Sequence, residues 1–148
     1  MTIKNNQKIK IIGAGLSGLS TGNTLSKNGY DVEIYEKNND VGGRFHGDFQ
    51  GLENWTEKTD VIDDLKGMNI ETDFNYYPQS EFYVSDGLKI QKVVSDKPAY
   101  YLVKRGAEDD SLDQALKKQA LKSGTAIFFN QTIPSAEADI IAPGPRMD

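Results

Sequence analysis

Apolar residues form two short runs near the start of the chain, separated by a mixed segment of helical length. The first run lies in Ile9–Ile12 and the second in Val32–Tyr35. Between them, Leu16–Lys27 holds leucines among small polar residues, and Asn28-Gly29 is typical of a helix terminus. The pattern predicts a strand, a helix and a second parallel strand, which together form one βαβ unit.

The middle of the chain is predicted to hold one short helix and a small antiparallel sheet. Residues 59–67 fit a helix that begins at a capping residue, Thr59 or Asp60, and ends in glycine. Two alternating runs flank a Ser-Asp-Gly turn within 82–93, which is typical of a β-hairpin. Residues 100–103 are expected to add a third strand and complete an antiparallel meander.

The last third of the chain predicts a helix followed by two strands. Ser111 is a good N-cap for a helix over 111–123, with Gln114 at the capping-box position and Gly124 expected to end the helix. Apolar residues recur within it at spacings of three and four. A buried parallel strand is expected at 125–129, beside the second strand of the βαβ unit. Residues 138–142 are expected to form the last strand.

The turn after the first strand carries glycines at the spacing of a dinucleotide-binding motif. Each glycine has its own expected role: a sharp turn at Gly13, close approach of a pyrophosphate at Gly15, and close helix packing at Gly18. The first amide groups of the helix would then face the phosphates. The predicted pyrophosphate site consists of Gly13, Ala14, Gly15, Leu16, Ser17 and Gly18.

An acidic residue follows at the end of the second strand. The Glu36 carboxylate can accept hydrogen bonds from ribose hydroxyls and would repel a 2′-phosphate, which favours FAD or NAD over NADP. Lys37 comes directly after it and is included in the predicted site. The alternative is a βαβ unit that binds nothing.

Two adjacent glycines and an arginine follow the acid after a short polar loop. The Gly42-Gly43 pair suits a backbone that passes close to a phosphate, and the guanidinium of Arg44 could bind that phosphate. The alternative is a plain surface turn with a solvated arginine.

Residues 13–44, GAGLSGLSTGNTLSKNGYDVEIYEKNNDVGGR, resemble the N-terminus of FAD-dependent oxidoreductases with a glutathione-reductase-type FAD domain. Among them the chain is most similar to geranylgeranyl-reductase-like flavoproteins, and its Gly-Gly-Arg also resembles amine oxidases and phytoene desaturases. The resemblance implies that the glycine turn holds the FAD pyrophosphate, Glu36 the adenosine ribose, and Gly43 and Arg44 the cofactor phosphate. It further implies cofactor contacts at Arg105, Thr132, Ile133 and Gly144. Pro143 departs from the family pattern, because proline cannot donate an amide hydrogen bond.

The expected fold class is α/β. Residues 8–44 and 104–148 are predicted to form a three-layer Rossmann-like FAD/NAD(P)-binding domain. An α+β insertion, the antiparallel meander, is expected at 45–103 as the start of a substrate-binding region. Because the resemblance covers only the front part of longer relatives, we expect the chain to be incomplete at its C-terminus. A homo-oligomer or a completing partner chain is then possible.

Composition excludes several function classes. The net charge of −5 argues against nucleic acid as a general partner, and the chain lacks cysteine for disulfides or thiolate chemistry. The single histidine offers no second imidazole for a metal, so no metal site is expected. Since no apolar run approaches 18 residues, we expect no membrane span and a cytoplasmic location. The hydrophobic fraction of 37% predicts a thin core.

Aromatic residues and the histidine offer weaker candidates. His46 could line a cleft near the flavin, but an ordinary loop residue is the favoured interpretation. Trp55 is expected to anchor packing. The chain's tyrosines could line an apolar substrate pocket, although covering one face of the sheet is favoured. These tyrosines are Tyr76, Tyr77, Tyr83, Tyr100 and Tyr101.

Taken together, these features predict the FAD-binding portion of a flavin-dependent oxidoreductase. The reaction would be hydride transfer between the flavin and a small or isoprenoid-like organic substrate. No catalytic residues are assigned, because the sequence offers no Ser-His-Asp set and no convincing acid–base pair. Two alternatives remain: a non-catalytic nucleotide-binding module or subunit that requires a partner chain, and an NAD-binding dehydrogenase domain.

Overall fold

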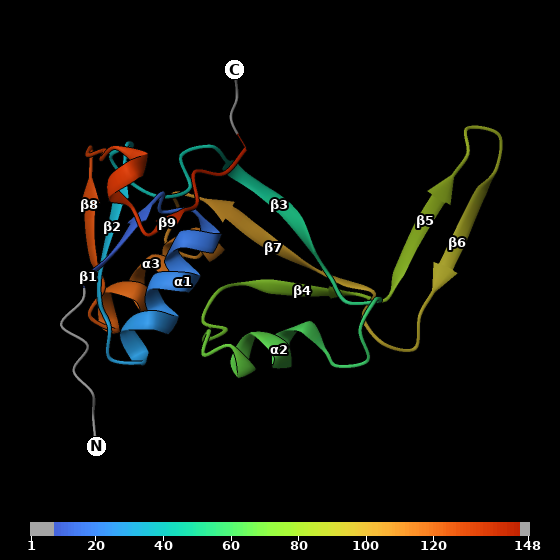
Figure 1. The fold of residues 1–148 in the computed structure, drawn as a ribbon. Helices are drawn as coiled ribbons and strands as arrows, with labels where there is room; N and C mark the ends of the chain where they lie inside the picture. The colour runs from blue at the N-terminus through green and yellow to red at the C-terminus, as the bar shows by residue number, and fades with distance from the viewer. Residues whose placement is uncertain (1–7, 146–148) are drawn as a thin grey trace.

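The computed structural model describes residues 8–145, which form three layers (Figure 1). A parallel sheet lies on one side, an antiparallel sheet on the other, and two helices lie between them. The predicted fold class, a three-layer α/β domain of Rossmann type, is confirmed. The sequence predicts a short disordered lead-in at residues 1–7, which lie outside the described residues.

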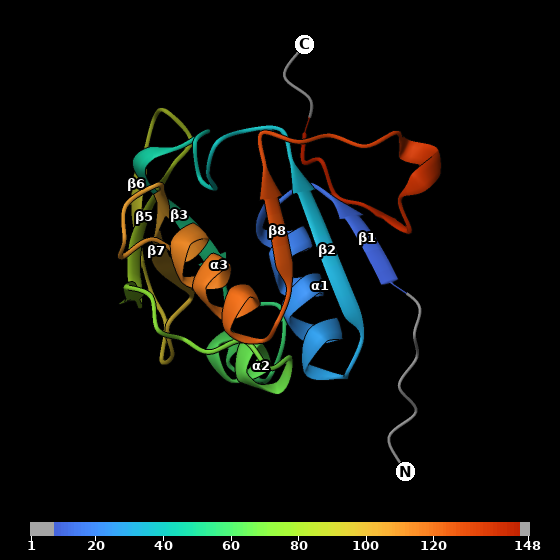
Figure 2. The ribbon, with the colours of Figure 1, turned by 90° about the vertical axis from the view of Figure 1, so that its left-hand side faces the viewer.

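The parallel sheet has four strands in the order β8-β2-β1-β9, all parallel to their neighbours (Figure 2). One face of this sheet packs against the helices. Alternating residues of the predicted apolar runs lie on that face and are fully buried, namely Ile11, Val32 and Ile34. The four strands expected here are confirmed. They are β1 (Lys8–Ile12), β2 (Asp31–Glu36), β8 (Ala126–Phe129) and β9 (Ile140–Ile141).

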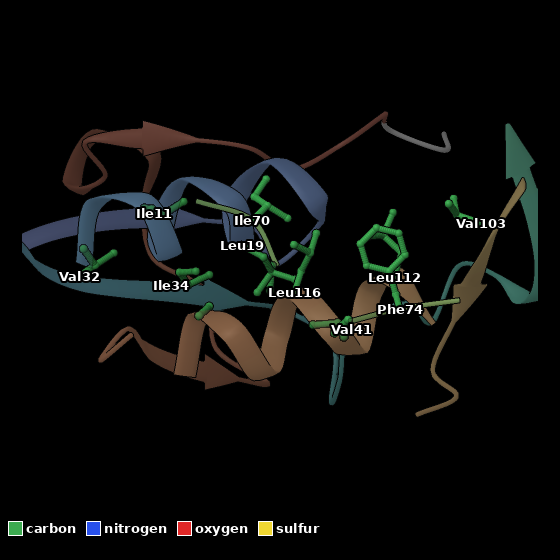
Figure 3. Packing of buried hydrophobic residues seen from close by; sticks show 13 residues of the cluster. Ile11, Leu19, Val32, Ile34, Val41, Ile70, Phe74, Val103, Leu112 and Leu116 are labelled. Atoms are coloured by element: carbon green, nitrogen blue, oxygen red, sulfur yellow. The ribbon is translucent and has the colours of Figure 1, made fainter. Parts of the chain in front are cut away.

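Helices α1 (Leu16–Lys27) and α3 (Leu112–Lys122) form the middle layer, as the helical patterns predicted. Leu19 and Leu116 lie between the two helices in the hydrophobic core (Figure 3). The glycines and small polar residues of α1 give it little intrinsic helix propensity. Packing against β2 and α3 therefore holds this helix in place.

Capping at both ends of α3 follows the prediction in part. The hydroxyl of Ser111 accepts the backbone amide of Gln114 at 3.2 Å, and Gly124 leaves the helix at φ +99°. The Gln114 side chain does not close a capping box, because it donates to Asp40 at 3.0 Å instead. This contact connects α3 to the loop after β2.

The antiparallel sheet has the order β3-β7-β4, with β3 (His46–Glu53), β7 (Tyr100–Gly106) and β4 (Tyr76–Gln79). Val103 of β7 is buried and faces the helix layer (Figure 3). Strand β3 carries no apolar alternation in the sequence, since most of its residues are exposed. The pattern therefore gave no signal for it.

A hairpin of β5 (Glu81–Ser85) and β6 (Ile90–Val94) confirms the predicted turn, with Gly87 at φ +88°. The expected three-strand meander is wrong, because the third strand, β7, pairs with β3 and β4 instead. Burial explains the difference. The apolar side chains of β7 pack on α3, whereas β5 and β6 project away from the body (Figure 1). The expected insertion is nevertheless antiparallel.

Helix α2 (Val61–Gly67) lies beside the antiparallel sheet and is confirmed. Asp60 is its N-cap, and its carboxylate accepts the amide of Ile62 at 2.9 Å. The helix ends at Gly67 as expected, and Asn69 follows two residues later at φ +62°. A short 3₁₀ turn, η1 (Ser135–Glu137), precedes β9.

Only some of the predicted tyrosines cover the antiparallel sheet. Tyr76 and Tyr101 pack edge to face across β4 and β7, with ring centroids 5.6 Å apart, which supports the sheet-covering interpretation. Tyr77 and Tyr83 are exposed. The expectation that Trp55 anchors packing is wrong, because its side chain is 63% exposed.

Candidate functional site

The glycine turn between β1 and α1 is tightly built from backbone. Gly13 adopts φ +99°, and its amide donates to the carbonyl of Tyr35 at 2.8 Å. A Cβ at Gly13 would overlap the carbonyl oxygen of Ala142, which follows β9. A Cβ at Gly18 would overlap the carbonyl oxygen of Gly13 in the same way. Internal packing therefore requires glycine at both positions.

Gly15 differs, because nothing in the described chain requires it to be a glycine. Its backbone is extended at φ −78° and ψ −178°, which any residue can adopt. A Cβ there would meet no atom within 4 Å. Gly43 likewise has open space where a Cβ would lie. Both positions leave room at the surface for a group that approaches the backbone closely.

The N-terminus of α1 lies at this open position. Gly15 is the N-cap, no side chain within residues 8–145 caps the helix, and its first turn contains no acidic residue. The first amides of such a helix are unpaired and carry the positive end of the helix dipole. Ser17 is exposed here, whereas Leu16 is half-buried against the core and Ala14 is buried. The arrangement suits an anion.

Glu36 lies directly beside the glycine turn. One carboxylate oxygen accepts the amide of Ala14 at 2.9 Å. The other accepts two donors from Asn38, its backbone amide at 2.9 Å and its side-chain amide at 2.7 Å. These bonds occupy three of about four acceptor positions of the carboxylate. One hydroxyl can therefore bind without rearrangement, and a second requires the Asn38 side chain to turn away.

The segment after β8 runs beside Glu36. The amide of Gln131 donates to the carbonyl of Glu36 at 3.0 Å, so the chain passes the acid just before Thr132. Thr132 is exposed and Ile133 is half-buried. Lys37 is also exposed. These predicted site residues lie near one edge of the sheet, and their roles stay predictions.

The chain after β9 closes the other side of the glycine turn. The amide of Ala142 donates to the carbonyl of Ile12 at 2.8 Å, and the backbone of Pro143 lies against Gly13. Gly144 is exposed at φ +73°. The proline therefore lies at the turn, where it offers no amide hydrogen.

The Gly-Gly-Arg loop follows β2 and lies against the end of β7. The amide of Phe45 donates to the carbonyl of Gly42 at 2.9 Å, which closes a turn. A Cβ at Gly42 would overlap the carbonyl oxygen of Gly106, so the two backbones pack directly. Arg44 is exposed, and no carboxylate within the described range forms an ion pair with it. Its guanidinium lies 5.7 Å from the centre of the Phe45 ring.

Arg105 is set apart from the glycine turn. Its side chain is buried and forms a bidentate ion pair with Asp113, with Nε–Oδ2 and Nη2–Oδ1 distances of 2.8 and 3.0 Å. A third donor, Nη1, bonds the side-chain oxygen of Gln50. The expected contact between Arg105 and the cofactor stays a prediction, although the guanidinium already has internal partners.

Several residues that shape this region carry no signal in the sequence. Asn38 orients Glu36, and Asp40 joins the loop to α3 through Gln114 and Lys117. Polar loop residues give no signal of such distant partners. His46 is exposed on β3 and its amide bonds Asp48, which matches the ordinary interpretation.

Burial and hydrogen bonding act in opposite directions on the Asp40 carboxylate. Burial tends to raise the pKa of Asp40, but hydrogen bonds from Lys117, the Val41 amide and Gln114 outweigh it and lower the pKa overall. Asp40 therefore stays ionised and keeps the loop attached to α3 at neutral pH.

Within residues 8–145 no cluster of three metal-ligating side chains occurs, and no helix is long and apolar enough to span a bilayer.

Curated proteins match a short part of the chain. A 4,4'-diapophytoene desaturase of Staphylococcus aureus is 49% identical over 39 residues, which cover 26% of this chain and 8% of that protein. A 4,4'-diaponeurosporene oxygenase of Staphylococcus haemolyticus is 50% identical over 38 residues, with the same coverage. The chain thus aligns with about 8% of the length of these relatives.

Solved structures share the fold over most of the chain. The 2-methyl-3-hydroxypyridine-5-carboxylic acid oxygenase matches at a TM-score of 0.62 and 22% identity, covering 84% of this chain and 31% of that one. A flavoprotein/dehydrogenase of Cytophaga hutchinsonii matches at 0.57 and 16%, covering 84% and 30%. Aklavinone-11 hydroxylase, solved with FAD and aklavinone, matches at 0.52 and 24%, covering 83% and 25%. The expected likeness to flavoprotein oxidoreductases is confirmed at the level of fold.

A sequence family accounts for the first half of the chain. The family described as NAD(P)-binding Rossmann-like domain matches residues 11–85, more than half of the 148 residues. The match includes the glycine turn, Glu36 and the Gly-Gly-Arg loop. The chain belongs to the NAD(P)-binding Rossmann-like domain family.

Proposed function

We propose that this chain is the FAD-binding part of a flavin-dependent oxidoreductase. The open space at Gly15 is the observation that carries the proposal. Internal packing accounts for Gly13 and Gly18 but leaves Gly15 unexplained, at the N-terminus of α1, where a pyrophosphate would approach bare amides. The residues present fit this half of FAD.

Each neighbouring residue then has a binding role. Glu36 accepts a hydrogen bond from the adenosine ribose, and its charge disfavours a 2′-phosphate. The guanidinium of Arg44 neutralises phosphate charge at the open backbone of Gly43. When bound, the flavin supplies the redox chemistry, and the protein binds and orients it.

The names of the curated relatives indicate a class of reaction. The curated relatives are named for a desaturation and an oxygenation, which are both redox reactions. Hydride transfer between the flavin and a small or isoprenoid-like organic substrate is consistent with these names. A homo-oligomer or a completing partner chain would cover the exposed apolar residues of the β5–β6 hairpin, such as Leu88 and Ile90.

Cofactor binding by the purified protein tests the proposal. We expect FAD to bind, with visible flavin absorbance, more tightly than NAD and far more tightly than NADP. Gly15→Val should abolish FAD binding, because its side chain would fill the cradle. Gly51→Val is the matched control, since a Cβ there makes only an ordinary 3.7 Å contact with Tyr100. FAD binding by Gly15→Val at parental affinity would overturn the proposal.

The ligand preference separates the alternatives. Bound flavin that turns over an electron acceptor supports the oxidoreductase, whereas bound flavin without turnover supports a non-catalytic module. A colourless protein that binds NAD supports a dehydrogenase domain instead. Glu36→Ala should weaken FAD binding by about 1–3 kcal/mol, because a hydrogen bond to a charged acceptor is lost.

A further inference from the structure

The buried ion pair between β7 and α3 is not part of the glycine turn or of the Glu36 site. Arg105 and Asp113 are 6% and 2% exposed, and two hydrogen bonds join them. The same carboxylate accepts the amide of Gly106 at 3.0 Å. Asp113 therefore fixes both the side chain and the following backbone at the end of β7. The pair is neutral as a unit, although each group is charged.

The face of the Arg105 guanidinium contacts the Gly-Gly-Arg loop. Its central carbon lies 4.1 Å from the centre of the Phe45 ring, a distance typical of a close cation–π contact. Arg44 lies over the same ring at 5.7 Å. Phe45 therefore contacts both the buried Arg105, whose charge Asp113 neutralises, and the exposed Arg44.

Two further contacts hold the same loop from either side. The backbone of Gly42 packs directly on Gly106, whose own Cβ position lies 3.4 Å from the carbonyl oxygen of Phe45. At the start of the loop, Asp40 pairs with Lys117 of α3 at 2.6 Å. The first turns of α3 thus anchor the loop at its start and, through Asp113, at its end.

We propose that Arg105 is a positioning residue, which holds Phe45 and through it orients Arg44 toward the cofactor phosphate. Because Asp113 neutralises Arg105, the exposed Arg44 beside it does not face an uncompensated positive charge. The inference rests on the proposed function for its ligand, but the loop contacts stand independently. It is an alternative to the expected direct contact between Arg105 and FAD.

Substitutions of Phe45 test the proposal without disturbing the buried pair. Phe45→Leu removes the ring, Phe45→Tyr keeps it, and Phe49→Leu is the matched control on β3, where Phe49 is 54% exposed. Hydrogen exchange of the residue-45 amide, which bonds Gly42, reports the order of the loop. Calorimetry with FAD and with adenosine reports phosphate binding separately from ribose binding.

We expect Phe45→Leu to exchange this amide faster and to bind FAD about tenfold more weakly, with adenosine affinity unchanged. Phe45→Tyr and Phe49→Leu should match the parent in all three measurements. Unchanged exchange in Phe45→Leu would overturn the proposal. An equal loss of FAD and adenosine affinity would also overturn it, because the effect would then be a general loss of structure.

Arg105→Lys separates positioning from direct contact. Lysine keeps the charge but loses the planar fork that pairs with Asp113 and stacks on Phe45. Faster exchange at the Phe45 amide together with weaker FAD binding supports positioning. Weaker FAD binding with parental exchange would show a direct contact and overturn the proposal. If the parent binds neither ligand, the proposed function fails, and hydrogen exchange alone decides whether Arg105 orders the loop.

Discussion

The parallel sheet and the β5–β6 hairpin are built from similar apolar residues but differ completely in burial. In the sheet, Ile11 and Ile34 are fully buried and pack against two helices. In the hairpin, Leu88 is 93% exposed and Ile90 is 74% exposed. An isolated two-stranded hairpin is at best marginally stable in water. The free energy of folding therefore comes mainly from the sheet and helix layers, with little from the hairpin.

The difference shows where close fit constrains the sequence. At the glycine turn, backbone atoms of Gly13, Gly18 and Ala142 lie so close that no side chain can be added. At the tip of the hairpin, Gly87 has open space around it and needs only its positive φ. Substitutions in the first region should therefore cost much more than substitutions in the second. Four predictions compare closely packed positions of the body with exposed positions, in order of expected loss of stability.

The largest loss is expected when the buried ion pair is broken. Arg105→Met should lower the free energy of unfolding by about 3–5 kcal/mol, because the buried Asp113 carboxylate loses its cationic partner and keeps only the Gly106 amide. Urea unfolding measures the change. The double substitution Arg105→Met with Asp113→Leu removes both charges and should recover much of the loss. A single substitution that costs less than the double one would contradict this account.

The next loss is expected at the glycine turn. Gly18→Ala should cost about 3 kcal/mol, because the new Cβ would overlap the Gly13 carbonyl and force the helix away from the turn. Gly67→Ala is the matched control at the end of α2, where a Cβ meets no atom within 4 Å. We expect the control to be neutral or slightly stabilising. Thermal unfolding measures the midpoint temperature of both variants. Equal midpoint temperatures would show that the turn tolerates a side chain.

The same contrast explains what the sequence could reveal. The βαβ unit was predictable because its strands, helix and glycine turn follow one after another, so local patterns describe the whole motif. Strand β3 was not predictable. Its neighbour β7 lies some fifty residues further along the chain, and the mostly exposed residues of β3 show no apolar alternation. The partners of β7 depend on burial against α3, which no local pattern reports. The meander was therefore a reasonable prediction from adjacency, and it was wrong.

The candidate site divides in the same way. The glycines and Glu36 were predictable, because their spacing is a local signature of the turn. The internal partners of Arg105 were not, because Gln50 lies 55 residues away and Asp113 is one acid among many. Likewise, nothing in the sequence distinguishes Asn38 from other loop residues, although it bonds Glu36 twice.

A pH-dependent effect of intermediate size is expected in the antiparallel sheet. Burial and then a hydrogen bond to Asp60 raise the pKa of Tyr101 to about 12. In the unfolded chain its pKa is about 10. The stability from the neutral hydroxyl is therefore fully present below pH 10 and is lost as the pH rises through 12.

Tyr101→Phe should cost about 2 kcal/mol at neutral pH, because the Asp60 carboxylate loses a donor. The difference from the parent should disappear as the pH approaches 12. Tyr77→Phe is the control, since its side chain is 48% exposed, and it should be neutral throughout. Denaturant unfolding between pH 7 and 12 measures both variants. Equal stability of Tyr101→Phe and the parent at pH 7 would mean that Tyr101 stabilises the sheet through packing of its ring alone. A difference that persists at pH 12 would show that the protonated hydroxyl is not its source.

The smallest effect is expected in the hairpin. Ile90→Thr keeps a β-branched side chain and should change the free energy of unfolding by at most about 0.5 kcal/mol, because Ile90 is 74% exposed. Ile34→Thr in β2 is the matched substitution at a fully buried position and should cost several times more. Parallel urea titrations compare the two. Equal losses would mean that the hairpin packs against another surface in solution, since only burial of Ile90 could give threonine there the same cost.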